Sequence, residues 1–256
     1  MLRPSIRIRL NSLSVSYKVT SFLTRGPVMA SKMSTASPRD AAVSSVEPMN
    51  TDDAKWITLK KITYTDPTGK QRLWESAERQ TRAKHSQIDA VGVVAVLNDP
   101  KSSHGPGLLL QKQFRPAVNA VAIEVPSGLI DEGEDPSTTA IRELKEETGY
   151  IGTIPGDAKA AEGFVMWNDP GFCNTNTKMV FIEVDMSDPR NQKENLKPEM
   201  EEGEFIESFT LPLNNLWNEL AKLEQEGYAI DARVGTLAQG MEMAKKFKAI
   251  LDKTPS

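Results

Sequence analysis

Residues 128–150 read GLIDEGEDPSTTAIRELKEETGY, and this stretch contains the signals for one sharply bounded helix. Asp135 is a good N-cap residue, because its short carboxylate can accept a hydrogen bond from the first turn. Pro136 suits the first helical position, since proline lacks the N–H that a helix leaves unpaired there. Gly149 suits the end, where the backbone often turns left-handed. The stretch therefore predicts a helix over residues 136–148.

The acidic residues of this helix fall on one side of it. At about 100° per residue, Glu143 and Glu147 project about 40° apart, and Glu146 lies about 60° to the other side of Glu143. Three further residues share a different arc: Ile141, Leu144 and Thr148. We expect this second arc to pack against a sheet, while the first presents three carboxylates to a cleft.

Carboxylates this close repel one another, which favours a cation among them. Arg142 can pair with Glu146 one turn along, but one guanidinium does not balance three acids. Hard oxygen ligands suit Mg²⁺ or Mn²⁺, which bind through a few carboxylates and the phosphates of a substrate. The alternative is a solvated acidic face without metal, which is the commoner fate of a run such as ELKEE.

The whole stretch resembles the Nudix box: glycine, five residues, glutamate, seven residues, then Arg-Glu-apolar-any-Glu-Glu-any-Gly and an apolar residue. The matching positions are Gly128, Glu134, Arg142, Glu143, Leu144, Glu146, Glu147 and Gly149. Tyr150 stands where the family usually has an aliphatic residue, which is a conservative departure. The resemblance implies hydrolysis of a nucleoside diphosphate linked to another group, and an α/β Nudix fold in which helices sandwich a mixed β-sheet.

By the same resemblance, several residues receive roles at a metal. Glu143 and Glu147 are implied as the principal ligands, and Glu146 as a further ligand or as the acid held by the neighbouring arginine. Glu134 is implied as an auxiliary carboxylate on the metal side, and Ser127 as the donor of a backbone carbonyl. The implied cofactor is Mg²⁺, with Mn²⁺ as the alternative.

The sequence on both sides resembles the ADP-ribose pyrophosphatases of eukaryotes, from about Lys55 to the C-terminus. The matching segments are KWITLKKITYTDPTGKQRLWESAERQTR, QFRP at 113–116, EVPSGLIDEGE, NDPGF near Asp169, GEFIESFTLP and YAIDARV. The resemblance implies that ADP-ribose is cut to AMP and ribose 5-phosphate. The alternatives are a broader nucleoside-diphosphate-sugar or oxidised-nucleotide hydrolase, and a sensor that binds ADP-ribose without cleaving it.

This second resemblance also implies contacts to the substrate. Trp56 and Trp74 would stack on adenine from the two sides of an interface, so the expected assembly is a homodimer with shared sites. The other residues implied to touch the substrate are Glu75, Arg79, Asp89, Arg115, Leu129, Asp169 and Gly171. The plain alternatives are structural: a sheet tryptophan, a surface ion pair or a simple turn.

A general base is implied in a mobile loop just before a late strand. Glu204, in EEGEFIE, is the best match, and Glu201 and Glu202 are neighbours that could take the same role. A carboxylate on such a loop can swing onto a water only when substrate is bound. The alternative is an acidic turn.

Outside the helix, the apolar pattern predicts more strands than helices. KWITLKKITY alternates from Lys55, breaks at residues 66–69 and resumes around 73–75, which predicts an N-terminal antiparallel hairpin. Further strands are expected at 90–97, 108–114, 120–125, 178–185 and 205–211, and further helices at about 214–226 and 232–253. In the first of these helices Leu216, Leu220 and Leu223 recur at helical spacing. Strands and helices out of strict alternation predict a mixed sheet between helices.

Composition sets the first 45 residues apart. Before the first acid, Asp40, the chain has eight serines and seven basic residues, which is typical of a mitochondrial transit peptide. The alternative is a disordered tail with later starts at Met29 or Met33. We expect residues 1–45 to be this leader, 46–85 the hairpin and dimerisation region, and 86–256 the Nudix domain. The expected location is mitochondrial, cytoplasmic or both, with the nucleus as a further option.

Charge and composition exclude several classes of partner. The chain of 256 residues carries a net charge of −4, and without residues 1–39 about −11 remains, whereas nucleic acid needs a basic surface. The single cysteine, Cys173, rules out an internal disulfide and a thiolate metal cluster. No apolar run approaches the roughly 20 residues that span a bilayer. We therefore expect neither nucleic acid nor membrane as a partner.

Overall fold

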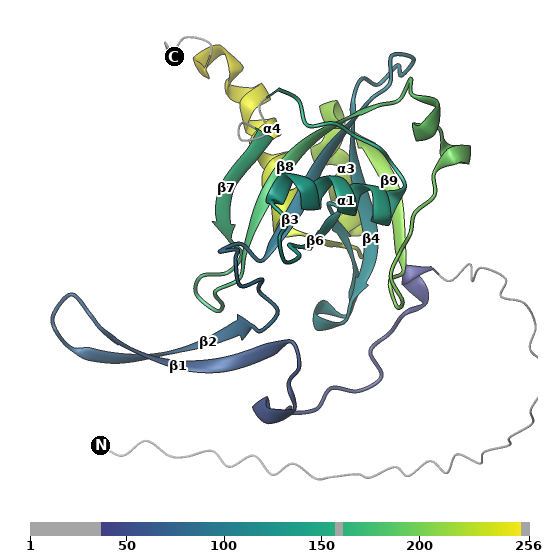
Figure 1. Cartoon of the computed structure of the whole chain (residues 1–256). Helices are drawn as coiled ribbons and strands as arrows, with labels where there is room; N and C mark the ends of the chain where they lie inside the picture. The colour runs from purple at the N-terminus through teal and green to yellow at the C-terminus, as the bar shows by residue number, and fades with distance from the viewer. Residues whose placement is uncertain (1–36, 157–160, 252–256) are drawn as a thin grey trace, which may run out of the picture. The chain divides into compact units, whose positions relative to one another are not determined.

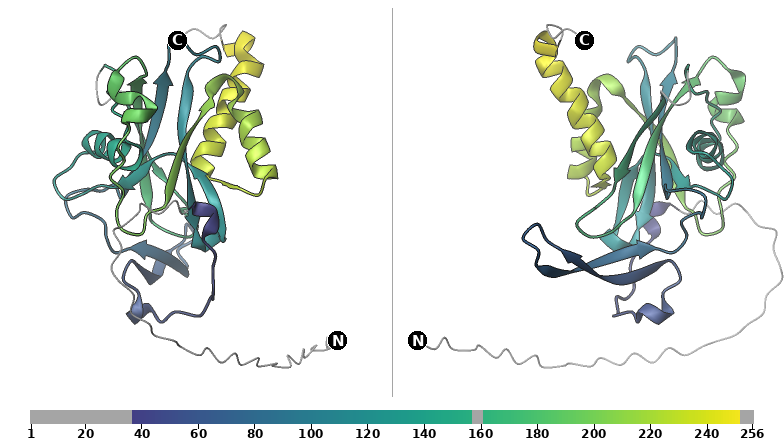
Figure 2. Two further views of the ribbon diagram at one scale, coloured as in Figure 1. Left: turned by 90° about the vertical axis from the view of Figure 1, so that its right-hand side faces the viewer. Right: turned by 60° about the vertical axis from the view of Figure 1, so that its left-hand side comes forward.

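A computed structural model describes residues 37–156 and 161–251 of the chain. The expected leader falls outside these residues up to position 36. A mixed sheet of eight strands forms the centre of the fold, in the order β10-β5-β4-β3-β8-β7, with β6 paired to β3 and β9 paired to β4. Helix α1 covers one face of this sheet, and helices α3 and α4 cover the other (Figure 1; Figure 2, left).

The strands and helices have the following bounds. The central sheet consists of β3 (Ala90–Asn98), β4 (Gly107–Arg115), β5 (Ala120–Glu124), β6 (Ser127–Leu129), β7 (Glu162–Trp167), β8 (Asn176–Asp185), β9 (Ile206–Pro212) and β10 (Ala229–Ile230). A separate hairpin consists of β1 (Ile57–Thr65) and β2 (Gln71–Arg79). The α-helices whose bounds fall in the described part of the chain are α1 (Pro136–Thr148), α3 (Leu216–Gln225) and α4 (Ala232–Leu251). Short 3-10 turns include Pro38–Asp40 and Pro116–Val118.

These elements confirm the predicted mixed sheet between helices with an appended antiparallel hairpin. The predicted helix over residues 136–148 has the observed bounds, and each predicted strand overlaps an observed one. Three strands were missed: β6, β7 and β10. β6 and β10 have three and two residues, too few to show a period of two, and most of β7 is exposed despite its apolar residues.

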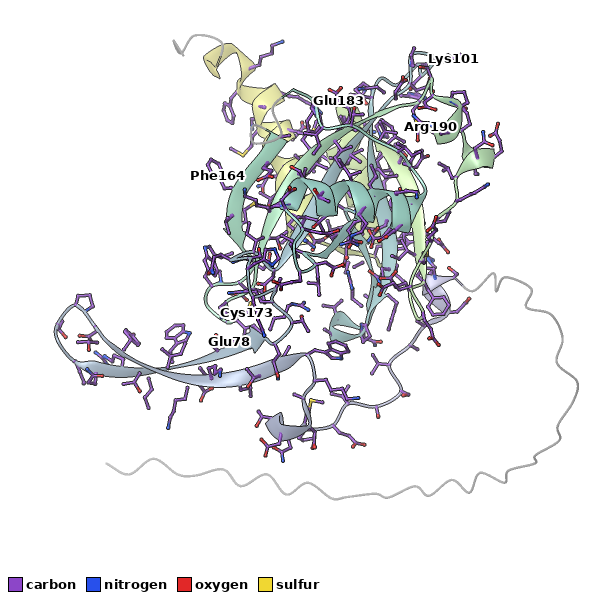
Figure 3. The ribbon with its side chains drawn as sticks, in the orientation of Figure 1. Glu78, Lys101, Phe164, Cys173, Glu183 and Arg190 are labelled. Atoms are coloured by element: carbon purple, nitrogen blue, oxygen red, sulfur yellow. The ribbon has the colours of Figure 1, made fainter. Side chains whose placement is uncertain are left out.

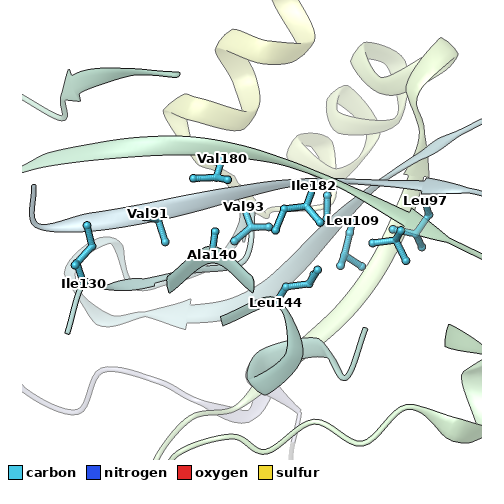
Figure 4. Close-up of a cluster of buried hydrophobic side chains, with 11 residues drawn as sticks. Val91, Val93, Leu97, Leu109, Ile130, Ala140, Leu144, Val180 and Ile182 are labelled. Atoms are coloured by element: carbon cyan, nitrogen blue, oxygen red, sulfur yellow. The ribbon is translucent and has the colours of Figure 1, made fainter. Parts of the chain in front are cut away.

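Two apolar clusters fill the space on the two faces of the sheet. On the α1 side, Ala140 and Leu144 pack on Val91, Val93 and Ile182 (Figure 4). On the other side, residues from α3 and α4 pack on alternate residues of β4 and β5. The strands contribute Leu108, Leu110, Val121 and Ile123, and the helices contribute Leu216, Leu220, Val234 and Ala238. Leu109 belongs to the first cluster and its neighbours Leu108 and Leu110 to the second, as the alternation of a strand requires.

The buried face of α1 differs from the predicted one. Leu144 and Thr148 are buried as expected, but Ile141 is 42% exposed, so its predicted packing against the sheet was wrong. Ala140 and Glu147 are buried instead. The small side chain of Ala140 lets the helix approach the sheet closely, and this rotation turns Glu147 inward.

Strands β3 and β4 are paired only near one end, which creates the space for a site. Their ladder comprises Val96 with Leu108 and Leu97 with Gly107. Beyond this point β3 pairs with β6 through residues 90–92, and β4 pairs with β5 and β9. The two central strands therefore diverge beneath α1, and β6 lies in the gap.

The β1–β2 hairpin is attached to the rest by its final residues. The Ala77 N–H donates to the Phe172 carbonyl at 3.0 Å, and Ala77 forms an isolated bridge with Cys173, close to Glu78 in Figure 3. Arg82 then pairs with Asp89 through two hydrogen bonds of 2.7 Å. The hairpin itself leaves large apolar side chains exposed: Trp56, Ile57, Leu59, Ile62, Tyr64, Leu73 and Trp74.

Residues 37–43, the N-terminal segment, pack on the central sheet and its connections although they fall within the expected leader. The Ser37 hydroxyl donates to Glu207 at 2.7 Å. The Arg39 guanidinium donates to the Tyr228 hydroxyl at 2.9 Å, with its carbon 4.3 Å from the centre of that ring. The Val43 N–H donates to Asn119. Among the described residues, no helix has the length and apolar character needed to cross a bilayer.

Candidate active site

The ends of α1 are fixed by the residues that the sequence indicated. The Thr138 N–H donates to the Asp135 carboxylate at 2.8 Å, which is the expected N-cap. Gly149 adopts a φ of +76°, and a Cβ there would lie 2.6 Å from the backbone nitrogen of Lys197. Glycine is therefore required for both conformation and space. The helix is held in one register relative to the sheet.

Arg142 gathers three of the glutamates named from the sequence. Its Nη1 donates to Glu143 at 2.8 Å and to Glu146 at 2.9 Å, and its Nε donates to Glu134 at 3.0 Å. The predicted pairing with Glu146 is thus present. The surrounding carboxylates raise the pKa of the Arg142 guanidinium, and the arginine lowers the pKa of Glu134.

Strand β6 brings two further glutamate contacts together. The Ser127 N–H donates to Glu147 Oε2 at 2.9 Å. At Gly128 a side chain is excluded, because a Cβ there would collide with the carboxylate of Glu143. The Leu129 carbonyl accepts a hydrogen bond from Arg142 at 3.3 Å. Three consecutive residues of one strand therefore contact three functional residues of α1: Ser127 contacts Glu147, Gly128 contacts Glu143 and Leu129 contacts Arg142.

Burial makes the two inner glutamates unusual acids. Desolvation, opposed by the Ser127 N–H and reinforced by the charges of Glu143 and Glu204, raises the pKa of Glu147 to about 8. Desolvation also raises the pKa of Glu143, against the opposing effect of Arg142. For both carboxylates, the nearby hydrogen-bond donors and positive charge do not offset the cost of burying the ionised form.

These carboxylates fit a divalent cation of the Mg²⁺ type. Within residues 37–156 and 161–251, no three acidic, histidine or cysteine side chains form a ready-made cage, since Arg142 draws Glu143 and Glu146 to itself. Mg²⁺ does not need such a cage, because it binds through one or two carboxylates and keeps several waters. Burial of Glu143 and Glu147 supplies the argument: desolvation raises the pKa of both carboxyl groups, and a nearby cation would stabilise their ionised forms.

A pocket of about 550 Å³ lies beside β6. Ser127, Gly128 and Leu129 line it together with Arg79, Arg115 and Arg233. This size is within the range of small-molecule sites, and three guanidinium groups suit phosphate oxygens. The same short strand thus contacts the glutamate cluster and lines a basic pocket.

Two of the pocket arginines are held by acids, of which Glu124 is buried and Asp231 is half-buried. Arg115 donates to both oxygens of Glu124, at 2.8 and 2.5 Å, which raises the pKa of the arginine. Arg233 pairs with Asp231 in the same bidentate way. Such pairing restrains each guanidinium while leaving one of its edges free.

The sequence reasoning assigned no role to several residues that line or brace this pocket: Glu124, Asn168, Thr177, Asp231 and Arg233. The YAIDARV segment contains Arg233, but no neighbouring residue in the sequence distinguishes this arginine from an arginine on the surface. Its place beside Arg115 depends on the parallel pairing of β10 with β5.

Several other residues expected at the substrate do not line this pocket. Trp56 and Trp74 are 67% and 47% exposed and do not line the pocket. Trp74 and Glu75 are neighbours on β2 and therefore point to opposite faces of the hairpin. Both oxygens of buried Asp89 are engaged, by Arg82 and by the Asn176 N–H.

Asp169 and Gly171 belong to the turn between β7 and β8. The Asp169 carbonyl accepts from the N–H groups of Phe172 and Cys173. Neither Asp169 nor Gly171 lines the pocket, whereas the adjacent Asn168 does. This turn contacts β2 through Phe172, so it links the hairpin to the pocket wall.

Glu204 lies in a turn just before β9. Its carboxylate accepts from the Glu201 N–H at 3.0 Å, and Gly203 between them adopts a φ of +90°. The negative charge of Glu204 contributes to the raised pKa values of both Glu143 and Glu147. Glu204 therefore interacts electrostatically with Glu143 and Glu147, while a hydrogen bond within its own turn holds its carboxylate.

Comparison with known proteins gives consistent matches. Residues 87–233 match the model of the NUDIX domain. An ADP-ribose pyrophosphatase of Saccharomyces cerevisiae is 48% identical over 82% of this chain and 87% of its own. An ADP-sugar pyrophosphatase of Mus musculus is 38% identical over 78% and 86%. An ADP-ribose pyrophosphatase of Bacillus subtilis is 28% identical over 68% and 81%.

Proposed function

This chain belongs to the Nudix hydrolase family, and we propose that it hydrolyses the diphosphate of ADP-ribose to AMP and ribose 5-phosphate. The observation that carries the proposal is the position of β6. This strand contacts Glu143 and Glu147 and also lines a pocket with three arginines. A diphosphate lying along β6 would meet both. The names of the yeast and bacterial relatives support ADP-ribose as that diphosphate.

In this proposal the arginines bind the diphosphate and the glutamates hold the metal. Arg79, Arg115 and Arg233 have guanidinium donors directed at one pocket, which suits phosphate oxygens. Glu143 and Glu147 would hold Mg²⁺, or Mn²⁺ in its place, with Glu146, Glu134 and the Ser127 carbonyl as further donors. A divalent cation at this place would neutralise charge that develops on the phosphates and lower the pKa of the attacking water.

We assign the general base to Glu204. It would leave its turn when substrate binds, accept a proton from water, and so allow the water oxygen to attack phosphorus while the bridging P–O bond breaks. Its contribution to the pKa values of Glu143 and Glu147 supports this assignment over Glu201 and Glu202. Glu204→Gln should lower kcat by about 10²–10⁴-fold, and the same substitution at Glu202 should have little effect.

We propose that adenine is recognised by a dimer of this chain. Trp56 and Trp74 are exposed on the hairpin, so they are free to stack on a base held by a second copy of the chain. Glu75, Asp89, Leu129, Asp169 and Gly171 are proposed to complete the ribose and base contacts. For Asp89 this requires that its Arg82 pairing be retained, since the buried carboxylate would otherwise lose its counter-charge.

A wider range of ADP-sugars is the second candidate, and the name of the mouse relative favours it. A sensor without catalysis is disfavoured, because all the box glutamates are present, with Glu147 buried and Glu143 half-buried beside β6. For the compartment, we infer import into mitochondria from the composition of residues 1–45. A fluorescent fusion of the full chain that stays out of mitochondria would contradict this.

The direct test uses the purified full chain, Mg²⁺ and ADP-ribose, with the products resolved by ion-exchange chromatography. We expect AMP and ribose 5-phosphate, no reaction in excess chelator, and loss of turnover in Glu147→Gln with nucleotide binding retained. ADP-glucose, NADH and oxidised guanine nucleotides serve as competing substrates. A much higher kcat/KM for one of these would refute ADP-ribose, and turnover that resists chelator would refute the metal mechanism.

A further inference from the structure

Strand β4 contains one buried polar residue that apolar packing does not explain. Leu108, Leu109 and Leu110 are buried apolar residues, as expected for a central strand, and the next residue, Gln111, has no exposed surface either. Burying an amide costs free energy unless its donors and acceptor are all paired. A leucine or methionine would fill the same volume without that cost.

The amide of Gln111 is only partly satisfied by hydrogen bonds. Its Nε2 donates to Glu147 Oε1 at 3.5 Å, at the long end of the hydrogen-bond range. Its Oε1 is buried and has no partner among the described residues. A polar atom left unpaired in a core is uncommon in folded proteins and calls for an explanation, of which a functional role is one.

The fold directs this amide at one target. Alternation along β4 places Leu109 and Gln111 on the face covered by α1, since Leu109 packs with Leu144 of that helix. Gln111 lies where β4 has diverged from β3, opposite Glu124 of β5 and Ser208 of β9. The gap beneath α1 thus contains Gln111 on one side and β6 on the other, with Glu147 between them.

We propose that Gln111 is a positioning residue for Glu147. The Ser127 N–H binds Glu147 Oε2 and the Gln111 amide binds Oε1, so each carboxylate oxygen receives one donor from an opposite direction. This pair fixes the plane of the carboxylate while leaving the other lone pairs of both oxygens available. A ligand restrained in this way loses less conformational freedom when it binds a cation. The inference rests on the proposed role of Glu147 as a metal ligand.

The test is Gln111→Met in the full chain, which keeps the side-chain length and removes the amide. Mn²⁺ binding is measured by electron paramagnetic resonance of the free ion, without substrate, and Mg²⁺ activation is measured alongside. We expect the Mn²⁺ Kd and the half-activating Mg²⁺ concentration to rise by about tenfold or more. KM for ADP-ribose at saturating Mg²⁺ should stay at the wild-type value, and the Tm of the metal-free protein should be equal or higher.

The matched control is Gln113→Met, two residues along on the same face of β4, where no change in Mn²⁺ affinity is expected. Wild-type Mn²⁺ affinity in Gln111→Met would overturn the proposal, and so would a lowered Tm with unchanged affinity, which indicates a structural role. If the methionine variant does not fold, Gln111→Leu gives the same comparison with a different shape.

A third variant separates this inference from the function on which it rests. Glu147→Gln should weaken Mn²⁺ binding if Glu147 is a ligand. If Glu147→Gln weakens binding and Gln111→Met does not, only the positioning role fails. If Glu147→Gln leaves Mn²⁺ binding unchanged, Glu147 is not a metal ligand, and the positioning role of Gln111 fails as well.

Discussion

Burial of Glu147 costs free energy, so stability alone would not favour a glutamate at this position. Its carboxylate is 5% exposed, receives one short hydrogen bond from Ser127 and a long one from Gln111, and lies near the charges of Glu143 and Glu204. Desolvation therefore raises its pKa to about 8. Perturbed acids of this kind concentrate at functional sites, where the bound ligand supplies the missing charge.

This raised pKa predicts how the stability of the metal-free protein depends on pH. The pKa of Glu147 is about 8 in the folded chain and near 4.5 in the unfolded chain. Between these values the folded chain retains a proton that the unfolded chain has released, so the free energy of unfolding should fall as pH rises from 4.5 to 8. Urea denaturation in chelator should show a shallower decline for Glu147→Gln. Parallel curves for the two proteins would count against the raised pKa.

Gly128 should tolerate no side chain. In Gly128→Ala the added methyl would displace the carboxylate of Glu143, which touches the glycine. We expect kcat to fall by about 10²-fold or more, as for other groups displaced from an active site, with the Tm little changed. Gly240→Ala in α4 is the control, because a Cβ there meets nothing within 4 Å. Equal activity of the two variants would show that Glu143 can occupy another position.

At the scale of elements, very short segments connect the parts of the site. β6 has three residues, yet it touches Glu143 and Glu147 and also lines the pocket. The N-terminal segment, residues 37–43, connects to β9 through Glu207 and to the residue before β10 through Tyr228. β9 follows the Glu204 turn, and β10 precedes Asp231 and Arg233.

The N-terminal segment should therefore contribute to stability through Arg39. Arg39→Ala removes a hydrogen bond to Tyr228 and a cation–π contact, and should lower the free energy of unfolding by about 1 kcal/mol. Arg190→Ala is the matched control, since the exposed Arg190 (Figure 3) pairs, among the described residues, with nearby Asp188; it should change the value by less than about 0.5 kcal/mol. Equal denaturation midpoints for both variants would show that the segment is not anchored by Arg39.

At the scale of the molecule, exposed apolar surface is concentrated on the hairpin and on β7. The hairpin exposes Leu59, Leu73 and Trp74, and β7 exposes Phe164, which is 89% accessible and projects away from the strand in Figure 3. A two-stranded hairpin is marginally stable by itself. Contiguous apolar surface of this kind marks an interface with another protein surface.

We predict that the chain forms a homodimer through this surface. Sedimentation at about micromolar concentration should give a dimer for the wild type and a shift towards monomer for Leu73→Asp, which places a charge on the hairpin. If sites are shared across the interface, the monomeric variant should also have a raised KM for ADP-ribose. Val46→Asp is the control, because Val46 is exposed and lies outside both strands. A wild type that sediments only as a monomer would contradict the dimer.

The sequence by itself determined α1, its caps and the side on which its acids lie, because N-cap geometry, proline at the first position and a left-handed glycine act within a few residues. It also determined the hairpin and the longer strands, where apolar alternation has enough residues to be visible. The pairing of Arg142 with Glu146 followed for the same reason, since residues four apart on a helix are always neighbours.

Only the tertiary structure decided which acid is buried and what surrounds it. The exposure of Ile141, the inward rotation of Glu147 and the place of Gln111 depend on how closely α1 approaches strands far from it in sequence. Arg233 joins Arg115 at the pocket only because β10 pairs with β5, about 100 residues apart in the chain. Contacts of this kind arise from the packing of whole elements, and no local pattern of residues encodes them.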